Sequence, residues 1–215
     1  LARVSKNLAC ILCIAGSAFA EDPLLMLYTA GSTGRPKGVP LKQSNLFFNA
    51  VNWILDVGIT KEDYTMTTIP LFHIGGHMLW TLPHLMVGGK ILLQRRFEPE
   101  ATLRLLAEEK ITNVYFIPAM AKMVLALPHW KDYDLSSLRF IGAGGEPVPE
   151  RVTNAFGELG IPVLNSYGLT ETADGTTTMR SWDALDRNHR LISIWRTYRG
   201  VAQIPSSTRN SGKSH

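Results

Sequence analysis

The chain has 215 residues, of which 45% are hydrophobic and 19% are charged. This balance is typical of globular proteins and excludes an intrinsically disordered chain. Its two cysteines, Cys10 and Cys13, exclude a disulfide-stapled mini-protein and a multi-cysteine zinc site. No apolar run reaches the roughly 20 residues of a membrane-spanning helix, so no transmembrane segment is expected.

The formal net charge of +4 is distributed unevenly along the chain. Residues 180–215 carry a net charge of +5, whereas residues 1–179 carry −1. Nucleic-acid binding requires basic groups arranged on a folded face. Because the excess charge is confined to one end, no nucleic-acid partner is expected. The sequence does not predict an oligomeric state.

The N-terminal segment, residues 1–21, does not match the rest of the chain in character. Arg3 and Lys6 precede an apolar stretch and then small residues, a pattern that is typical of a secretory signal peptide. The alternative is a buried strand or helix of a fold whose beginning is missing. Cys10 and Cys13 have redox-motif spacing, but their apolar setting favours inert buried thiols.

Residues 22–179 alternate between strand and helix patterns. In chain order, strands are predicted at 24–28, 64–69, 90–94, 112–117 and 138–141, and immediately after 162–164. Helices are predicted at about 44–55, 74–87, 98–110, from 118, and at 149–159. This alternation predicts an α/β fold with a largely parallel sheet layered by helices. Ligands of such sheets bind at the carboxyl ends of the strands.

Three of these elements carry more detailed expectations. The strand at 24–28 is expected to be buried, and Gly142 is expected to begin the loop after the strand at 138–141. The first helix is expected to start from a cap at Ser44 or Asn45. Its predicted apolar face consists of Phe47, Ala50, Val51, Ile54 and Leu55.

The C-terminal segment, residues 180–215, shows neither strand nor helix periodicity. Its basic, polar composition predicts a disordered tail. The abrupt change near Met179 suits a frameshift, an unusual splice or a truncated conceptual translation.

The segment that follows the first strand has the composition of a phosphate-binding loop. Glycines let backbone N–H groups approach an anion, hydroxyls donate hydrogen bonds, and a lysine supplies charge. The common P-loop pattern does not fit, because Pro36 and Gly38 occupy positions that require glycine and a hydroxyl residue. A surface turn is the alternative. The candidate phosphate ligands are Thr29, Gly31, Ser32, Thr33, Gly34 and Lys37.

Three later segments complete a pattern. They are Pro70-Leu71-Phe72-His73-Ile74-Gly75-Gly76, Gly144-Gly145-Glu146-Pro147 and Asn165-Ser166-Tyr167-Gly168-Leu169-Thr170-Glu171-Thr172. Together with the glycine-rich loop, in this order, they resemble the AMP-forming adenylate-forming superfamily, in a form similar to fatty-acyl- or aryl-CoA ligases. The resemblance covers about residues 22–179 and implies a central fragment of the large N-terminal domain of such an enzyme.

The resemblance implies a reaction and its co-substrates. A carboxylic acid and ATP would form an acyl-adenylate and pyrophosphate, with Mg²⁺ bound to the nucleotide. Coenzyme A would then accept the acyl group. Since the reaction brings anions together, it needs charge neutralisation and alignment. ATP and coenzyme A imply a cytoplasmic location, although residues 1–21 resemble an export signal.

The resemblance also implies a role for each matched position. Lys37, Thr170 and Glu171 would form the catalytic set, with Thr170 on the α-phosphate and Glu171 as the Mg²⁺ ligand. Tyr167 would stack on adenine. His73, Gly75 and Gly142 would line the acyl pocket. The remaining nucleotide contacts would come from Gly144, Gly145, Glu146, Pro147, Asn165 and Gly168.

Simpler interpretations stay open for several of these residues. Tyr167 could belong to the core, and Glu171 could be a solvated acid at a helix start. His73 and His77 are four residues apart, as helical zinc ligands can be, but no glutamate follows His73 and the nearby glycines weaken a helix.

Two features of the family are absent from the sequence. We find no Tyr-x-Thr-Gly-Asp, whose aspartate would bind the ATP ribose, and Lys213 is the only lysine after Lys131. The surroundings of Lys213 do not resemble the family's lysine-bearing C-terminal domain. The alternative to a ligase is therefore a catalytically incomplete, nucleotide-binding remnant.

Overall fold

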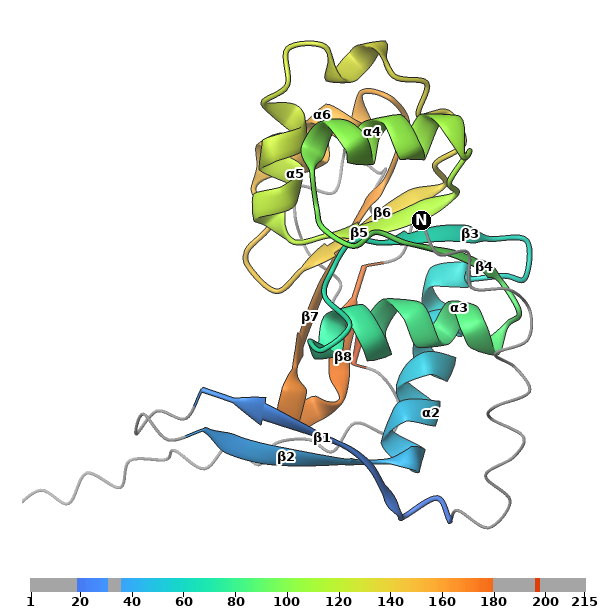
Figure 1. The fold of residues 1–215 in the computed structure, drawn as a ribbon, viewed down its shortest axis with the longest axis vertical. Helices are drawn as coiled ribbons and strands as arrows, with labels where there is room; N and C mark the ends of the chain where they lie inside the picture. The colour runs from blue at the N-terminus through green and yellow to red at the C-terminus, as the bar shows by residue number, and fades with distance from the viewer. Residues whose placement is uncertain (1–18, 31–35, 180–195, 198–215) are drawn as a thin grey trace, which may run out of the picture.

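A mostly parallel sheet forms the centre of the molecule (Figure 1). The computed structural model describes residues 19–30, 36–179 and 196–197. Within this part, the sheet order is β4-β3-β5-β6-β7-β8-β9, with parallel pairing from β4 to β7 and antiparallel pairing at β8 and β9. The strands are β3 (Tyr64–Thr67), β4 (Lys90–Leu93), β5 (Asn113–Phe116), β6 (Phe140–Gly144), β7 (Val163–Leu169), β8 (Asp174–Thr178) and β9 (Arg196–Thr197). The predicted α/β class and its largely parallel sheet are confirmed.

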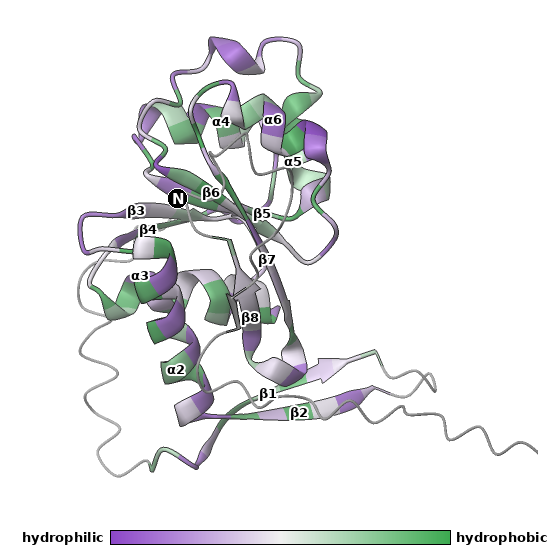
Figure 2. Cartoon of the chain, turned by 180° about the vertical axis from the view of Figure 1, so that it is seen from behind, coloured by the Kyte–Doolittle hydropathy of each residue, from purple (hydrophilic) through white to green (hydrophobic). Residues whose placement is uncertain are grey.

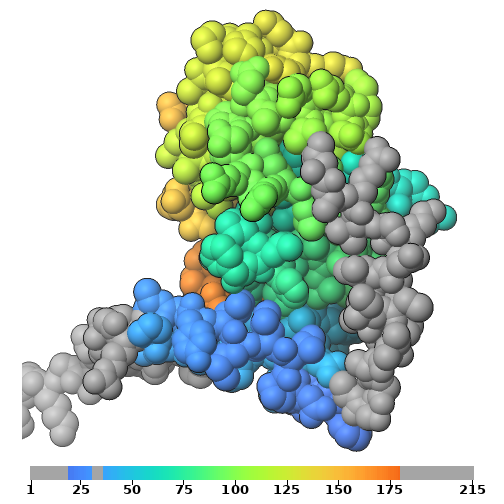
Figure 3. All heavy atoms as spheres, in the orientation of Figure 1, coloured from blue at the N-terminus to red at the C-terminus, as the bar shows by residue number. Residues whose placement is uncertain are grey.

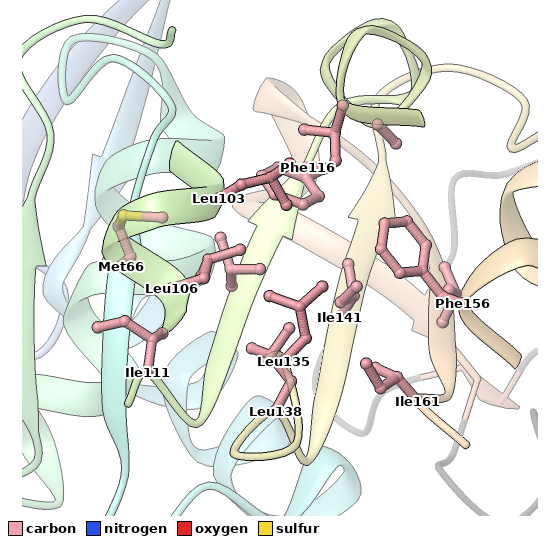
Figure 4. Packing of buried hydrophobic residues seen from close by; sticks show 14 of the residues in the cluster. Met66, Leu103, Leu106, Ile111, Phe116, Leu135, Leu138, Ile141, Phe156 and Ile161 are labelled. Atoms are coloured by element: carbon pink, nitrogen blue, oxygen red, sulfur yellow. The ribbon is translucent and has the colours of Figure 1, made fainter. Parts of the chain in front are cut away.

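Helices cover both faces of this sheet (Figure 1). One face carries α4 (Pro99–Glu108), α5 (Pro118–Leu125) and α6 (Glu150–Gly157). Their buried side chains form the larger core with the strands, and Figure 4 shows Leu106, Phe116 and Phe156 within it. The other face carries α2 (Gln43–Trp53), the π-helical turns η2 (Ile54–Gly58) and η3 (Gly75–Thr81), and α3 (Leu82–Met86). The short 3-10 turn η4 (Trp130–Asp132) follows α5.

The core on the second face is aromatic. The rings of Trp53, Trp80 and Tyr115 approach one another with centroids 5.2–6.5 Å apart. All three side chains are at most 4% exposed. Edge-to-face and tilted ring pairs of this kind stabilise a core beyond the area that they bury. The sheet is therefore fixed from both sides.

An ion pair between the buried Asp63 and the partly exposed Arg139 fixes the amino-terminal edge of the sheet. The two Asp63 carboxylate oxygens accept hydrogen bonds of 2.7 Å from Arg139, and Thr112 and the Thr60 backbone N–H donate further ones. Burial would raise the pKa of Asp63, but these donors and the Arg139 charge lower it below the usual range. Asp63 is thus held ionised, and it ties the start of β3 to the approaches of β5 and β6.

A separate two-stranded antiparallel sheet lies beside the main one. It pairs β1 (Pro23–Thr29) with β2 (Lys37–Lys42), and Figure 3 shows these residues in blue at the lower end of the molecule. The strand predicted at 24–28 is confirmed, but the expectation that it is buried was wrong. Leu24, Met26 and Tyr28 are 55–70% exposed, because alternate residues of the ribbon face outward while Leu25 and Leu27 pack inward.

The first helix also differs from expectation. It begins at Gln43, and Asn45 lies inside its first turn, where its side chain accepts a 2.9 Å hydrogen bond from the Lys42 N–H. The buried face consists of Leu46, Asn49, Ala50 and Trp53. The predicted face was wrong at Phe47 and Leu55, which are 53% and 75% exposed. Figure 2 shows polar and apolar residues along this helix.

One strand boundary was also misjudged, and strands β8 and β9 were not expected. Gly142 does not begin a loop, because β6 continues to Gly144. The antiparallel strand β8 was not predicted at all. Part of the segment expected to be disordered, Arg196–Thr197, pairs with β8 as β9. The other residues of 180–215, and residues 1–18, lie outside the described part of the chain.

No helix in the described ranges is both long enough and apolar enough to cross a membrane.

We expect Phe116→Ala to lower the free energy of unfolding by about 3–5 kcal/mol, because it empties a fully buried ring site. Urea denaturation followed by tryptophan fluorescence measures this change. Phe72→Ala is the matched control, since Phe72 is 83% exposed and should cost less than about 0.5 kcal/mol. Equal effects of the two substitutions would contradict the assignment of Phe116 to the core.

Candidate functional site

The motif segments gather at the carboxyl-terminal edge of the sheet. The segment containing His73 follows β3, Gly145 follows β6, and Thr170 and Glu171 follow β7. Parallel strands deliver their following loops to one edge, which is where α/β sheets bind ligands. The chain therefore brings together residues that are up to about a hundred positions apart.

The β1–β2 ribbon holds the two ends of the candidate phosphate loop. Thr29 is the last residue of β1, Lys37 is the first of β2, and the two are paired in the ladder. Lys37 is exposed and Thr29 is partly buried. Pairing of these residues closes the loop between them at its base. Gly31, Ser32, Thr33 and Gly34 lie outside the described residues, so their role remains a prediction.

A long-range hydrogen bond connects this ribbon to the end of β7. The Thr29 hydroxyl donates to Glu171 Oε1 at 3.3 Å, across 142 residues of sequence. Thr29 was predicted to bind phosphate, and Glu171 was predicted to bind Mg²⁺. The structure therefore places two predicted ligands of one metal–phosphate group in direct contact, with Lys37 beside them in the ribbon.

The Asn165–Glu171 segment is mostly strand rather than loop. Asn165 and Tyr167 lie in β7, and Thr170 and Glu171 belong to the 3-10 turn η5 (Thr170–Thr172). Tyr167 is 52% exposed, which excludes the alternative that its ring belongs to the core. An exposed ring of this kind offers a flat apolar face to a ligand.

Close backbone approaches account for the glycines of the site. A Cβ on Gly168 would overlap the carbonyl of Asp174 on the neighbouring strand. A Cβ on Gly144 would overlap the Ser166 carbonyl and the Tyr115 hydroxyl. Gly145 adopts φ +83°, which glycine tolerates best. This φ turns the chain out of β6, so that Gly145, Glu146 and Pro147 are exposed at the strand end.

The predicted acyl-pocket residues fall into two groups. His73 is exposed, and its Nδ1 accepts a 3.0 Å hydrogen bond from the Gly75 N–H, which orients the ring. Gly142 is buried in β6 instead. A Cβ there would lie 2.5 Å from the Tyr115 ring and 2.8 Å from the Trp80 ring. Since aromatic side chains already fill this space, the structure does not bring Gly142 together with His73.

Comparison with known proteins identifies the family. A family model described as AMP-binding enzyme matches residues 14–194. The chain belongs to the AMP-binding enzyme family. The match extends past both ends of the 22–179 region that carries the motif resemblance.

Curated relatives in this family are CoA ligases. The chain is 36% identical over 186 residues to feruloyl-CoA synthase of Amycolatopsis sp., which covers 86% of this chain and 36% of that protein. It is 40% identical over 164 residues to indoleacetate–CoA ligase of Aromatoleum aromaticum, covering 76% and 32%. The chain thus spans about a third of the length of these relatives.

Solved structures give the same assignment. The N-terminal domain of FACL13 from Mycobacterium tuberculosis matches with a TM-score of 0.74 and 26% identity, over 84% of this chain and 47% of that one. O-succinylbenzoate coenzyme A synthetase from Bacillus subtilis, in complex with ATP and magnesium ion, matches with a TM-score of 0.67 and 32% identity, over 75% and 33%. The fold is that of the N-terminal domain of adenylate-forming enzymes.

Glu171 meets the chemical requirements for a metal ligand in an AMP-binding enzyme. Its carboxylate is exposed, and it accepts a hydrogen bond from the neutral Thr29 hydroxyl. Among the described residues, no group of three or more His, Cys, Asp or Glu side chains could hold a metal ion. Mg²⁺ commonly takes one or two carboxylates and completes its shell with phosphate oxygens and water. Glu171 fits this arrangement, with the nucleotide as the second source of ligands.

Asp174, the first residue of β8, was not predicted from the sequence as a candidate site residue. It is 8% exposed, and its Oδ2 has no hydrogen-bond partner among the described residues. Burial raises the pKa of the Asp174 carboxyl to about 7. The one signal in the sequence is an aspartate at the start of a threonine-rich strand, where aspartate is generally depleted.

The buried Asp174 predicts a specific dependence of stability on pH. Its folded-state pKa, about 7, lies above the ordinary value of 3.8, so the folded state retains a proton that the unfolded state has lost between these values. The free energy of unfolding should therefore fall as pH rises from about 4 to 7, by at most about 4 kcal/mol. Asp174→Asn should remove this part of the dependence, and urea denaturation at pH 4.5 and 8 measures it.

The exposed Asp132 provides the control for this measurement. Asp132→Asn removes a carboxylate of the same kind from the surface, and it should leave the pH dependence as in the wild type. An Asp174→Asn protein with the wild-type slope would show that the Asp174 carboxyl is solvated.

Proposed function

We propose that this chain carries the ATP- and acyl-binding part of an AMP-forming acid–CoA ligase. The Thr29–Glu171 contact is the observation that carries the proposal. It brings the end of β1, after which the glycine-rich segment begins, to the Tyr-Gly-Leu-Thr-Glu segment, although nothing in the local sequence requires them to meet. Membership of the AMP-binding enzyme family and the CoA-ligase relatives support the same reaction class.

The proposed chemistry has two steps. A carboxylate oxygen of the acid attacks the α-phosphorus of ATP, which forms an acyl-adenylate and releases pyrophosphate. The sulfur of coenzyme A then attacks the acyl carbon, which forms a thioester and releases AMP. In the first step two anions must approach, so fixed positive charge and oriented donors lower its barrier.

The phosphate side of the proposed site is built from three segments. Thr29, Gly31, Ser32, Thr33, Gly34 and Lys37 hold the β- and γ-phosphates. Thr170 donates to the α-phosphate, and Glu171 binds Mg²⁺, whose charge offsets that of the phosphates. Lys37 adds a second positive charge at the base of the loop.

The adenine side uses the ends of β6 and β7. The exposed Tyr167 ring stacks on the purine, next to Asn165 and Gly168 in the same strand. Gly144, Gly145, Glu146 and Pro147 border the base at the neighbouring strand end, where the last three are exposed.

The acid lies on the side of His73 and Gly75. The names of the relatives include feruloyl, indoleacetate and 2-succinylbenzoate, all of which contain an aromatic ring. We therefore propose an aromatic acid rather than a fatty acid. Gly142 contributes indirectly, by leaving room for the Trp80 and Tyr115 rings that form the wall behind. ATP and coenzyme A as co-substrates favour a cytoplasmic reaction.

Nucleotide binding without turnover is the second candidate function. The sequence contains no Tyr-x-Thr-Gly-Asp, and it has a single lysine after Lys131. These observations favour a chain that binds ATP but does not complete adenylation by itself.

Lys37→Ala should weaken ATP binding about tenfold or more, because it removes one charged contact to phosphate. Isothermal titration with ATP and Mg²⁺ measures the change. Lys61→Ala is the matched control, since Lys61 is 76% exposed and lies at the opposite edge of the sheet, before β3. Unchanged affinity in Lys37→Ala would remove the loop from the site.

Pyrophosphate exchange separates the two candidate functions. We expect the 215-residue chain to bind ATP but to incorporate little labelled pyrophosphate into it, with or without an aromatic acid. The reason is that neither the ribose-binding aspartate motif nor the adenylation lysine segment is found in its sequence. Robust exchange that requires the acid would instead establish a complete adenylation site in this chain.

A further inference from the structure

Asp174 is a buried carboxyl that the proposed adenylation chemistry does not use. The residue is 8% exposed, and among the described residues nothing donates a hydrogen bond to its Oδ2. Its backbone has φ +87°, directly after Ala173 with φ +59°. Two successive non-glycine residues in the left-handed region are uncommon, and such strain concentrates at functional sites.

The surroundings of this carboxyl include the predicted acyl motif. A Cβ built on Gly75 would lie 3.8 Å from Asp174 Oδ2 and 3.3 Å from His73 Nδ1. The carboxyl and the imidazole therefore flank the same side of Gly75, at the start of η3. Burial in the first place, and the Asp174 charge in the second, raise the pKa of Tyr115. The Asp174 charge therefore also acts electrostatically on the Tyr115 hydroxyl.

Comparison with Asp63 argues against a purely structural role. Asp63 is also buried, but Arg139, Thr112 and the Thr60 N–H satisfy its oxygens. A buried carboxylate without donors costs free energy, and a carboxyl retained for stability is normally paired as Asp63 is. Asp174 has no comparable cation or donor on its Oδ2 among the described residues. A donor from outside the chain would complete its hydrogen bonding.

We propose that Asp174 is a specificity-determining residue that accepts a hydrogen bond from a hydroxyl or amino substituent of the acid. This inference rests on the proposed function, because it assigns the acid to the side of His73 and Gly75. The carboxyl selects for acids that carry a donor and against their hydrocarbon parents. An unsubstituted ring would leave Oδ2 buried and unpaired, whereas a hydroxyl or amino group would satisfy it.

The test is a titration of matched acids into the 215-residue chain in the presence of saturating ATP and Mg²⁺. The ligands are benzoate and cinnamate, each with its ring-hydroxylated and ring-aminated isomers. The proteins are the wild type, Asp174→Gly, Asp174→Asn and the surface control Asp132→Asn. Glycine and asparagine both tolerate the left-handed backbone at this position. Glycine removes the acceptor, while asparagine keeps an acceptor oxygen without the charge.

We expect at least one hydroxylated or aminated isomer to bind the wild type about tenfold tighter than its parent acid. Asp174→Gly should abolish this preference while changing the affinity of the parent acid less than about threefold. Asp174→Asn should give an intermediate preference, and Asp132→Asn should behave as the wild type. Comparison of the best hydroxyl and amino isomers identifies which donor the site takes.

Other outcomes overturn the inference in distinguishable ways. If the chain binds ATP but the wild type does not prefer substituted acids, or if Asp174→Gly retains the preference, Asp174 does not set specificity and the proposed function stands. If ATP binds and no acid does, the acyl side is wrong and the nucleotide site stands. If ATP itself does not bind, the proposed function fails and the inference fails with it. Should Asp174→Gly not fold, the intermediate preference of Asp174→Asn decides.

Discussion

The close approach of the Asp174 carbonyl to Gly168 is the constraint on which the candidate site depends. No side chain fits at Gly168, and the ladder shifts its register between Tyr167 and Gly168. This approach folds β8 back tightly on β7, with η5 at the turn. The turn puts Glu171 within reach of Thr29 and turns the Asp174 side chain inward. One backbone contact therefore positions both Glu171, on the proposed phosphate side, and the buried Asp174 carboxyl, on the proposed acyl side.

The rest of the scaffold holds that turn in a defined position. Aromatic packing of Trp53, Trp80 and Tyr115 on one face and the larger core under α4–α6 on the other hold the parallel strands. The Asp63–Arg139 pair closes the amino-terminal edge. Since rigid strands end at the opposite edge, the residues that follow them have defined positions without contacts among the loops themselves. Sites supported in this way are more precise than sites on loops alone.

Much of the main sheet could be predicted from the sequence, because buried parallel strands leave short β-rich apolar runs and amphipathic helices leave a periodic apolar face. The helices from Pro99 and Pro118 also carry their start signals at the first helical position. The β1–β2 ribbon could not be predicted in the same way, since apolar residues at 24–28 look alike whether one face or both are covered. The motif residues were found by their order along the chain, but their contact in space depends on β8. That strand consists mainly of threonine and glycine, so it has no apolar periodicity from which it could be predicted.

Asp174 could not be predicted from the sequence for a related reason. The feature that distinguishes it, a buried carboxyl oxygen without a hydrogen-bond donor among the described residues, exists only in the folded state. Asp63 and Asp174 are both acids at the start of a strand, and no periodicity in the sequence distinguishes them. In the structure Asp63 has a full set of donors and contributes to stability, whereas burial of Asp174 costs stability across neutral pH. Natural proteins tolerate such local conflicts chiefly where function requires them. The same threonine-rich turn that excludes a side chain at Gly168 keeps the Asp174 carboxyl in place. The strained backbone and the unpaired oxygen therefore occur at the same residue, and a donor on a bound acid would pair with that oxygen.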